Sequence, residues 1–179
     1  ELPLVHDQQE SIAISLLHAT TNPIHEQALA KKLAEDKAFY LTLSSEIAPF
    51  AHYLKRTQTT VVNAYLKPIL NEYLKRITER LSTESEVLIL SSTGTLHQPD
   101  HYEAKDSLLS GPAGGVAAAT AIGKQFNRTQ LLTFDMGGTS TDTTRIDGYP
   151  TMAYTTKIDQ IELHNPTLSI ETVAAGGGS

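Results

Sequence analysis

The chain has 179 residues, of which 40% are apolar and 19% charged, and its net charge is -6. This is an ordinary globular composition, and an acidic chain without a basic stripe argues against nucleic-acid binding. The lack of cysteine excludes disulfides, thiolate metal sites and thiol nucleophiles. No apolar run approaches the roughly 20 residues that span a bilayer, and the first residues do not resemble a signal peptide. We therefore expect a cytoplasmic protein with no nucleic-acid or membrane partner.

The first elements in the chain are a strand, a helix and a second strand. Residues 11–19 form a short apolar run that predicts a buried strand. Asn22 and Pro23 are typical of a helix start, as cap and first helical residue. The Ala-, Lys- and Glu-rich residues 25–36 continue that helix, and the aromatic residues 39–43 predict the next strand.

Residues 57–81 show the clearest helical pattern, because apolar residues recur at spacings of three and four. Such a stripe predicts a helix that packs against a sheet or another helix. Pro68 lies inside the pattern and predicts a kink or a break. The expected apolar face consists of Val62, Leu66, Ile69, Tyr73, Ile77 and Leu81, widened by Leu70 and Leu74.

A strand over residues 86–90 and a loop over 91–107 are expected before a helix of small residues that runs to about residue 126. Gly111 and Gly114 come where this helix opens, so its N-terminus could face an anion. The alternative is that small residues let the helix pack closely on a sheet. The two glycines could also serve both purposes.

The second half predicts three strands in series, over residues 131–134, 142–146 and 151–157, with a hairpin signal at Asp147-Gly148. Helices alternate with strands early in the chain, and strands follow strands late. This order predicts the α/β class, with a mixed β-sheet and flanking helices.

The stretch from Asp135 to Asp142 is the main candidate for chemistry. An apolar strand ends in Asp135, glycines then allow a tight turn and close approach to a ligand, and a second strand leaves from Asp142. Backbone N–H groups in such a turn can bind phosphate oxygens. The two carboxylates could hold Mg²⁺. The alternative is a plain hairpin with a polar tip. The candidate phosphate-binding residues are Gly137, Gly138, Thr139, Ser140 and Thr141.

The chain ends at Gly176-Gly177-Gly178-Ser179. Three glycines at a terminus are typical of a flexible tail, but residues 173–175 before them look like the end of a strand. That context favours a glycine-rich loop that is cut short. Because the chain also starts without Met, we expect a fragment of a longer protein.

Five stretches of the chain match the motifs of one family. They are residues 22–26 (NPIHE), 43–49 (LSSEIAP), 56–68 (RTQTTVVNAYLKP), 108–115 (LLSGPAGG) and 133–142 (TFDMGGTSTD). In this order they resemble the hydantoinase A / 5-oxoprolinase family, which includes N-methylhydantoinases and the related subunit of acetone carboxylases. The resemblance covers about residues 11–179.

The resemblance implies an actin-like ATPase fold, which is ribonuclease H-like, with ATP and Mg²⁺ between two lobes. It implies that residues 1–85 are the end of the first lobe plus a long connecting helix. Residues 86–179 would start the second lobe, whose phosphate-binding hairpin is 135–142. The D-x-G-G-T hairpin of the first lobe is missing. We therefore expect the chain by itself to hydrolyse ATP weakly or not at all.

The implied reaction is the ATP-dependent opening of a small cyclic amide, activated by phosphorylation of its oxygen, with a hydantoinase B-type subunit as partner. Asp135 would hold Mg²⁺ or orient water, and Asp142 would brace the turn or join the metal shell; these are the expected catalytic residues. Residues 137–140 would cradle the phosphates, with Gly111 and Gly114 nearby. Thr141 completes the expected cofactor-binding set.

Two alternatives stay open. The chain could belong to an ATP-using subunit like that of acetone carboxylase, or to a divergent non-catalytic member that binds a nucleotide or only a partner. The second is motivated by departures from the family pattern. Ser169 and Glu171 replace an Asp and a His before the glycine-rich end, and residues 92–95 read STGT where S-N-G-G is common.

Overall fold

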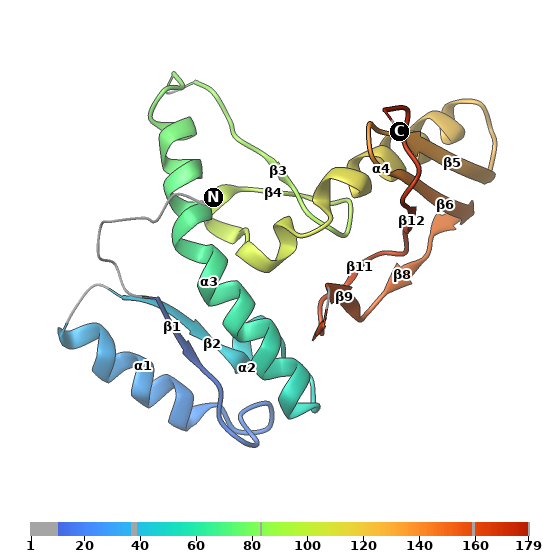
Figure 1. Cartoon of the computed structure of the whole chain (residues 1–179). Coiled ribbons are helices and arrows are strands. Elements are labelled where there is room, and N and C mark those ends of the chain that lie inside the picture. Colours follow the sequence, from blue (N-terminus) through green and yellow to red (C-terminus); the bar gives the residue numbers. More distant parts are fainter. Residues whose placement is uncertain (1–10, 37–38, 83, 159, 179) are drawn as a thin grey trace. The chain divides into compact units, whose positions relative to one another are not determined.

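The computed structural model describes residues 11–36, 39–82, 84–158 and 160–178 (Figure 1). The chain forms two compact units. Unit 1 contains the described residues up to Ser85 together with Glu103–Lys105 and Lys157–His164, and unit 2 contains Glu86–Tyr102, Asp106–Thr156 and Asn165 onward. The assignment of residues 1–85 and 86–179 to two ATPase lobes stays a prediction.

Unit 1 begins with a strand–helix–strand unit (Figure 1). β1 (Ser11–Ile14) pairs in parallel with β2 (Tyr40–Leu43), and parallel neighbours need a crossover, here α1 (Ile24–Asp36). The Ile24 N–H donates to Asn22 Oδ1 at 3.3 Å, which confirms the predicted cap. The predicted strand over 11–19 is too long, because the chain leaves β1 after Ile14 and turns at residues 17–21.

A short helix, α2 (Ser44–Ile47), leads to the long helix α3 (Tyr53–Thr78). Pro68 does not break α3, although it cannot donate to the carbonyl of Ala64 one turn earlier. The Ser11 hydroxyl donates to that carbonyl instead, at 2.5 Å. A side chain of β1 thus replaces the hydrogen bond that proline removes.

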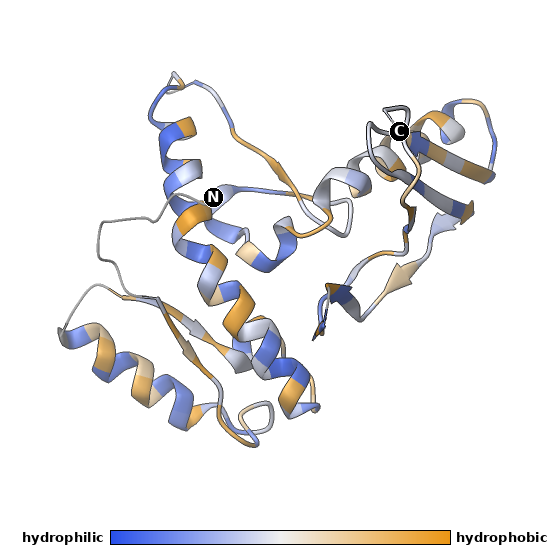
Figure 2. Ribbon diagram, viewed as in Figure 1, coloured by the Kyte–Doolittle hydropathy of each residue, from blue (hydrophilic) through white to orange (hydrophobic). Residues whose placement is uncertain are grey.

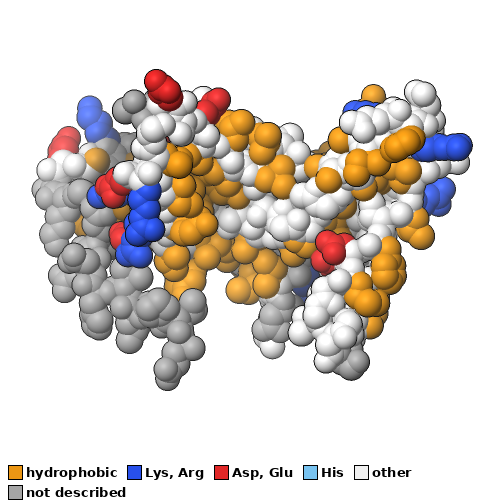
Figure 3. All heavy atoms as spheres, turned by 90° about the horizontal axis from the view of Figure 1, so that it is seen from above, with side chains coloured by type: hydrophobic (Ala, Val, Ile, Leu, Met, Phe, Trp, Pro, Cys, Tyr) orange, Lys and Arg blue, Asp and Glu red, His pale blue; other side chains and the backbone are white. Residues whose placement is uncertain are grey.

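The buried face of α3 is largely polar, so the predicted packing face is only partly correct: it includes the buried Leu74 but also several exposed residues. Ile69 and Tyr73 are 45% and 61% exposed, and the helix carries hydrophilic and hydrophobic bands (Figure 2). Hydrophobic side chains are also visible on the surface in the space-filling view (Figure 3). Hydrogen bonds to neighbouring segments therefore act together with the burial of Ala64 and Leu74 to hold α3 in place. Its buried residues are Arg56, Thr59, Thr60, Asn63, Ala64 and Leu74.

A buried network of charged and polar groups connects α1, α2 and α3. Glu26 Oε1 accepts from the Ser44 hydroxyl at 2.6 Å and from the Leu16 N–H at 2.8 Å. Arg56 donates from Nε to Ser44 Oγ at 3.0 Å and from its Nη2 nitrogen to the Leu16 carbonyl at 2.7 Å. Because buried charges are costly unless they are hydrogen-bonded, these contacts explain why three of the motif stretches carry polar residues.

Polar residues of α3 also attach two later segments of the chain to unit 1. The Thr59 hydroxyl accepts from the His164 N–H at 2.8 Å. Asn63 accepts from the Lys105 N–H at 2.8 Å and donates to Glu103 at 3.2 Å. The polar residues of the 56–68 motif that make these contacts therefore hold unit 1 together.

Unit 2 starts with β3 (Ile89–Leu90) and β4 (Leu96–His97), which pair antiparallel. The predicted strand over 86–90 is thus shorter, and the predicted loop contains a strand and two 3₁₀ turns, Pro99–His101 and Ala104–Ser107. Helix α4 (Ser110–Gln125) follows, as expected.

The main sheet of unit 2 has the order β12-β6-β5, with β7 paired to β6. Its strands are β5 (Gln130–Met136), β6 (Thr141–Asp147), β7 (Tyr149–Pro150) and β12 (Glu171–Val173). Gly148 takes a φ of +75° between β6 and β7, in keeping with the predicted turn. Ala113 and Val116 of α4 form the core with Ile146 and Leu168.

The predicted strand over 151–157 is two short strands instead. β8 (Met152–Ala153) pairs with β11 (Thr167–Leu168), and β9 (Thr156–Ile158) pairs with β10 (Ile161–Leu163). Parallel and antiparallel pairs with packed helices confirm the α/β class. Within the described part of the chain, no helix combines the length and apolar character needed to cross a bilayer.

Candidate phosphate-binding site

The β5–β6 hairpin changes from apolar to acidic along one face. Directly opposed residues of antiparallel strands point to the same side, and this side lies against α4. The polarity rises from the buried core toward the turn. The successive pairs are Leu131 with Ile146, Thr133 with Thr144, and Asp135 with Asp142.

A pocket of about 210 Å³ lies between α4 and the polar end of this face. Gly115 is the α4 residue next to the carboxylates, because a Cβ there would lie 3.5 Å from Asp135 Oδ2. A larger side chain would fill this space. The lining residues are Pro112, Gly115, Val116, Ala119, Thr133, Phe134, Asp135, Asp142, Thr144 and Ile170.

The two carboxylates of the hairpin have different surroundings. Asp142 Oδ1 accepts from the Thr172 hydroxyl of β12 at 2.6 Å. Asp135 is exposed, and no hydrogen bond or ion pair to it is found among the described residues. Like charges directly across a strand pair repel each other. A divalent cation would neutralise that repulsion, so the donor set fits a hard cation such as Mg²⁺.

The turn between the strands points backbone amides outward. The Gly177 and Gly178 N–H groups donate to the carbonyls of Gly137 and Gly138, each at 3.0 Å. All described peptides are trans, so each N–H lies opposite the preceding carbonyl. The N–H groups of Gly138 and Thr139 therefore point away from the glycine-rich end, and neither has a partner within the described chain.

Other predicted site residues lie in several environments. Ser140 closes the turn through its carbonyl, which accepts from the Gly137 N–H at 2.9 Å. Thr141 is buried, and its hydroxyl donates to the Ala175 carbonyl at 2.5 Å. That hydroxyl proton is therefore engaged within the protein.

Gly111 and Gly114 were expected to lie at the opening of the helix, facing a possible anion. They lie instead within the first turns of α4. A Cβ at Gly114 would lie 3.0 Å from Leu90, whereas one at Gly111 would meet no atom within 4 Å. Neither glycine lines the pocket beside Asp135. The geometry at Gly114 fits close packing on β3, and a ligand-binding role for either residue stays a prediction.

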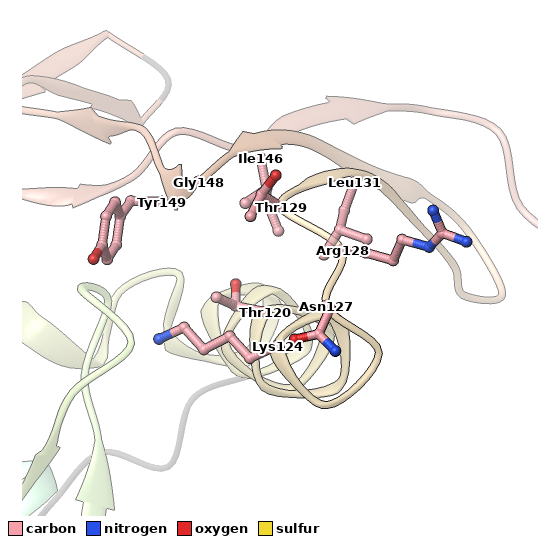
Figure 4. A pocket seen from close by; sticks show the side chains of 9 residues that line it. All are labelled: Thr120, Lys124, Asn127, Arg128, Thr129, Leu131, Ile146, Gly148 and Tyr149. Atoms are coloured by element: carbon pink, nitrogen blue, oxygen red, sulfur yellow. The ribbon is translucent and has the colours of Figure 1, made fainter.

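A second pocket, of about 440 Å³, is formed near the C-terminal end of α4 (Figure 4). Lys124 reaches toward the side of Tyr149, with its Nζ 5.8 Å from the ring centroid, while Arg128 points away. None of the predicted site residues lines this pocket. The smaller pocket is lined by two of them, Asp135 and Asp142, but by none of residues 137–141.

Comparison with known proteins shows the family of the chain. The model of the hydantoinase/oxoprolinase family matches residues 56–179, which include the hairpin, its pocket and the glycine-rich end. The chain belongs to the hydantoinase/oxoprolinase family. It is 39% identical to 5-oxoprolinase of Saccharomyces cerevisiae over 95% of its length, but covers only 14% of that relative.

Two solved structures have the fold of this family chain. The ATP-dependent caprolactamase from Pseudomonas jessenii is 32% identical, with a TM-score of 0.84 over 95% of this chain and 26% of that one. Acetone carboxylase without nucleotide is 24% identical, with a TM-score of 0.73 over 91% of this chain and 24% of that one. The second likeness shows the fold alone.

Several residues at the site were not expected from the sequence. A Cβ at Gly115 would meet Asp135, Thr172 donates to Asp142, and the glycine-rich end lies against the turn. Gly115 belongs to the glycine-rich motif at residues 108–115, but the sequence does not show which of its glycines, Gly111, Gly114 or Gly115, lies at the site. Only the pairing of β12 with β6 brings Thr172 to Asp142.

Proposed function

We propose that this family member is an ATP-dependent hydrolase of small cyclic amides, in which the β5–β6 turn holds ATP phosphates. The observation that carries the proposal is the pair of outward N–H groups on Gly138 and Thr139, in the turn that joins the strands of Asp135 and Asp142. Amides bind phosphate without net positive charge, which suits a chain of net charge -6. The whole protein's activity is proposed, because the chain spans a minor part of its relatives.

When bound, ATP supplies the phosphoryl group that makes an amide carbon susceptible to water. The residues of the chain contribute position and charge, which is the main task of a protein in phosphoryl transfer. The N–H groups of Gly138 and Thr139 would bind phosphate oxygens, and Gly137 would allow their close approach. The Ser140 carbonyl holds the turn closed.

The carboxylates would divide their roles. Asp142, held by Thr172, would brace the hairpin and complete the metal shell. Asp135, which has no such hydrogen bond among the described residues, would bind Mg²⁺ directly or through water. Mg²⁺ typically uses one or two protein carboxylates and keeps several waters.

The relatives favour amide hydrolysis over carboxylation. The S. cerevisiae relative is named a 5-oxoprolinase and the 32% identical structure is an ATP-dependent caprolactamase, whereas acetone carboxylase is less similar. A non-catalytic role would be motivated by Ser169 and Glu171, but Glu171 is exposed on β12. The hairpin itself keeps its carboxylates and amides.

A partner subunit and the cellular compartment belong to the same proposal. One relative is called caprolactamase subunit alpha, which supports a hydantoinase B-type partner for this protein. The chain has no cysteine, which fits a reducing compartment such as the cytoplasm.

The experiment is to measure ATP consumption and ring opening by the complete protein with its partner. 5-Oxoproline, caprolactam and hydantoin are tested separately, and acetone with bicarbonate serves as the carboxylase control. We expect ADP to appear in step with a ring-opened product from one cyclic amide. Turnover only with acetone and bicarbonate, or none with any substrate, would contradict the proposal.

A further inference from the structure

The glycine-rich end of the chain makes a regular set of contacts with the turn of the β5–β6 hairpin. We call residues 174–178, which follow β12, the glycine clasp. Two of its N–H groups bind consecutive carbonyls of the turn, Gly137 and Gly138, at 3.0 Å. Its Ala175 carbonyl accepts from the Thr141 hydroxyl on the other side of the turn. The clasp therefore holds both sides of the hairpin tip.

These contacts fix the direction of the turn peptides. A glycine peptide can rotate more freely than others, because glycine has access to more backbone conformations. If the peptide after Gly138 rotated by half a turn, its carbonyl oxygen, instead of its N–H, would face the proposed phosphate. The clasp opposes that rotation by binding the carbonyls on the far side.

Gly176 is the residue on which this arrangement depends. A Cβ there would overlap the backbone of Gly138 and Thr139. Its φ lies outside the left-handed region, so close approach rather than backbone conformation is the reason for glycine. Gly177 is different, because a Cβ there would lie 3.9 Å from the nearest turn atom, the Gly137 carbonyl oxygen.

We propose that the glycine clasp is a positioning element that keeps the Gly138 and Thr139 amides directed at phosphate, and that Gly176 is its essential residue. This inference rests on the proposed function, since it assumes that the turn binds phosphate. It adds a requirement outside the hairpin, in a segment about 40 residues further along the chain.

The test compares Gly176→Ala with Gly177→Ala in the complete protein, using Mg·ATP as the ligand. We expect Gly176→Ala to weaken Mg·ATP binding by about tenfold or more, because hydrogen bonds to charged groups are lost. Gly177→Ala should bind within about twofold of wild type, because its methyl group meets no close atom. Hydrogen exchange in residues 174–178 should accelerate only in Gly176→Ala.

The outcomes separate the two proposals. If wild type does not bind Mg·ATP, the proposed function fails. If wild type and Gly176→Ala bind Mg·ATP equally, or if both variants lose binding to the same extent, the clasp proposal alone is wrong. If Gly176→Ala does not fold, Gly178→Ala replaces it, since a Cβ there would lie 3.0 Å from the Gly138 carbonyl oxygen. Unchanged binding and exchange in that variant would also overturn the clasp.

Discussion

Asp135 and Asp142 lie directly opposite each other across the β5–β6 hairpin, and Thr172 donates a hydrogen bond to Asp142. One carboxylate is therefore held by the protein, while the other is exposed beside the pocket. This asymmetry fits the proposed division of roles, in which Asp142 braces the hairpin and Asp135 binds the ligand. It also leaves two like charges facing each other, an arrangement that costs stability unless a cation neutralises it.

Asp135→Asn should therefore make the hairpin more stable in Mg²⁺-free buffer. Relief of cross-strand repulsion is worth roughly 0.2–1 kcal/mol, which thermal unfolding can detect. Added Mg·ATP should then raise the melting temperature of wild type more than that of the variant, which binds it more weakly. Asp147→Asn, at the other end of β6, is the matched control and should keep the response. A variant that is less stable than wild type without Mg²⁺ would contradict this account of the pair.

Thr172→Val should weaken the Mg²⁺ dependence of nucleotide binding, because the isosteric side chain cannot donate to Asp142. Thr172→Ser keeps the hydroxyl and should behave like wild type. The measurement is the Mg²⁺ concentration that gives half-maximal ATP binding, which should rise several-fold in Thr172→Val. An equal loss in both variants would indicate a role for the methyl group and would contradict the hydrogen-bond explanation.

The sequence shows the candidate residues of the hairpin itself, but not the residues from elsewhere that contact it. Asp135 and Asp142 could be recognised because carboxylates, glycines and hydroxyls follow one another within one short stretch. Thr172 and Gly176 could not, because they reach the site only through the pairing of β12 with β6. A single sequence does not give the register of strands that are distant along the chain.

The helix α3 shows the same limit in another form. The recurrence of apolar residues every three or four positions correctly predicts a helix and the burial of Leu74, but it misses the polar residues that make up most of the buried face. Arg56 and Asn63 face the interior because Ser44, Leu16 and residues 103–105 supply hydrogen-bond partners from elsewhere in the chain. Hydrophobic periodicity cannot detect partners of that kind.

Ser11→Ala should destabilise unit 1 by about 1–3 kcal/mol, because the buried Ala64 carbonyl loses its donor. In the Pro68→Ala background the N–H of residue 68 returns, so the same substitution should cost much less. The measurement is a double-mutant cycle from urea unfolding of the four proteins. Additive effects of the two substitutions would show that Ser11 does not replace the bond removed by Pro68.

Glu26 should give unit 1 an acid-sensitive stability. Burial raises the pKa of Glu26, but hydrogen bonds from the Ser44 hydroxyl and from the Ser45 and Leu16 N–H groups outweigh it and hold the pKa below 4.5. A carboxyl whose pKa is lower in the folded than in the unfolded state stabilises the fold at pH values above its unfolded pKa. This stabilisation is lost as the pH falls through the folded pKa.

Glu26→Gln should accordingly cost about 3 kcal/mol at pH 7, because it removes a buried, fully hydrogen-bonded charge. The difference from wild type should shrink below pH 4.5. Urea unfolding measured from about pH 3 to about pH 7, a range that covers the titration of carboxyl groups, tests both effects. Glu46→Gln, at an exposed position of α2, is the control. A wild-type to Glu26→Gln difference that is independent of pH would contradict the role of the carboxylate.

The most direct test of the central claim is a calorimetric titration of Mg·ATP into the complete protein and into Asp135→Asn. We predict that wild type binds Mg·ATP and that the variant binds it about tenfold more weakly or worse, in line with the loss of a charged contact. Omitting Mg²⁺ should not weaken ATP binding by the variant any further. Equal binding by both proteins would contradict the assignment of Asp135, and no binding by wild type would contradict the phosphate site itself.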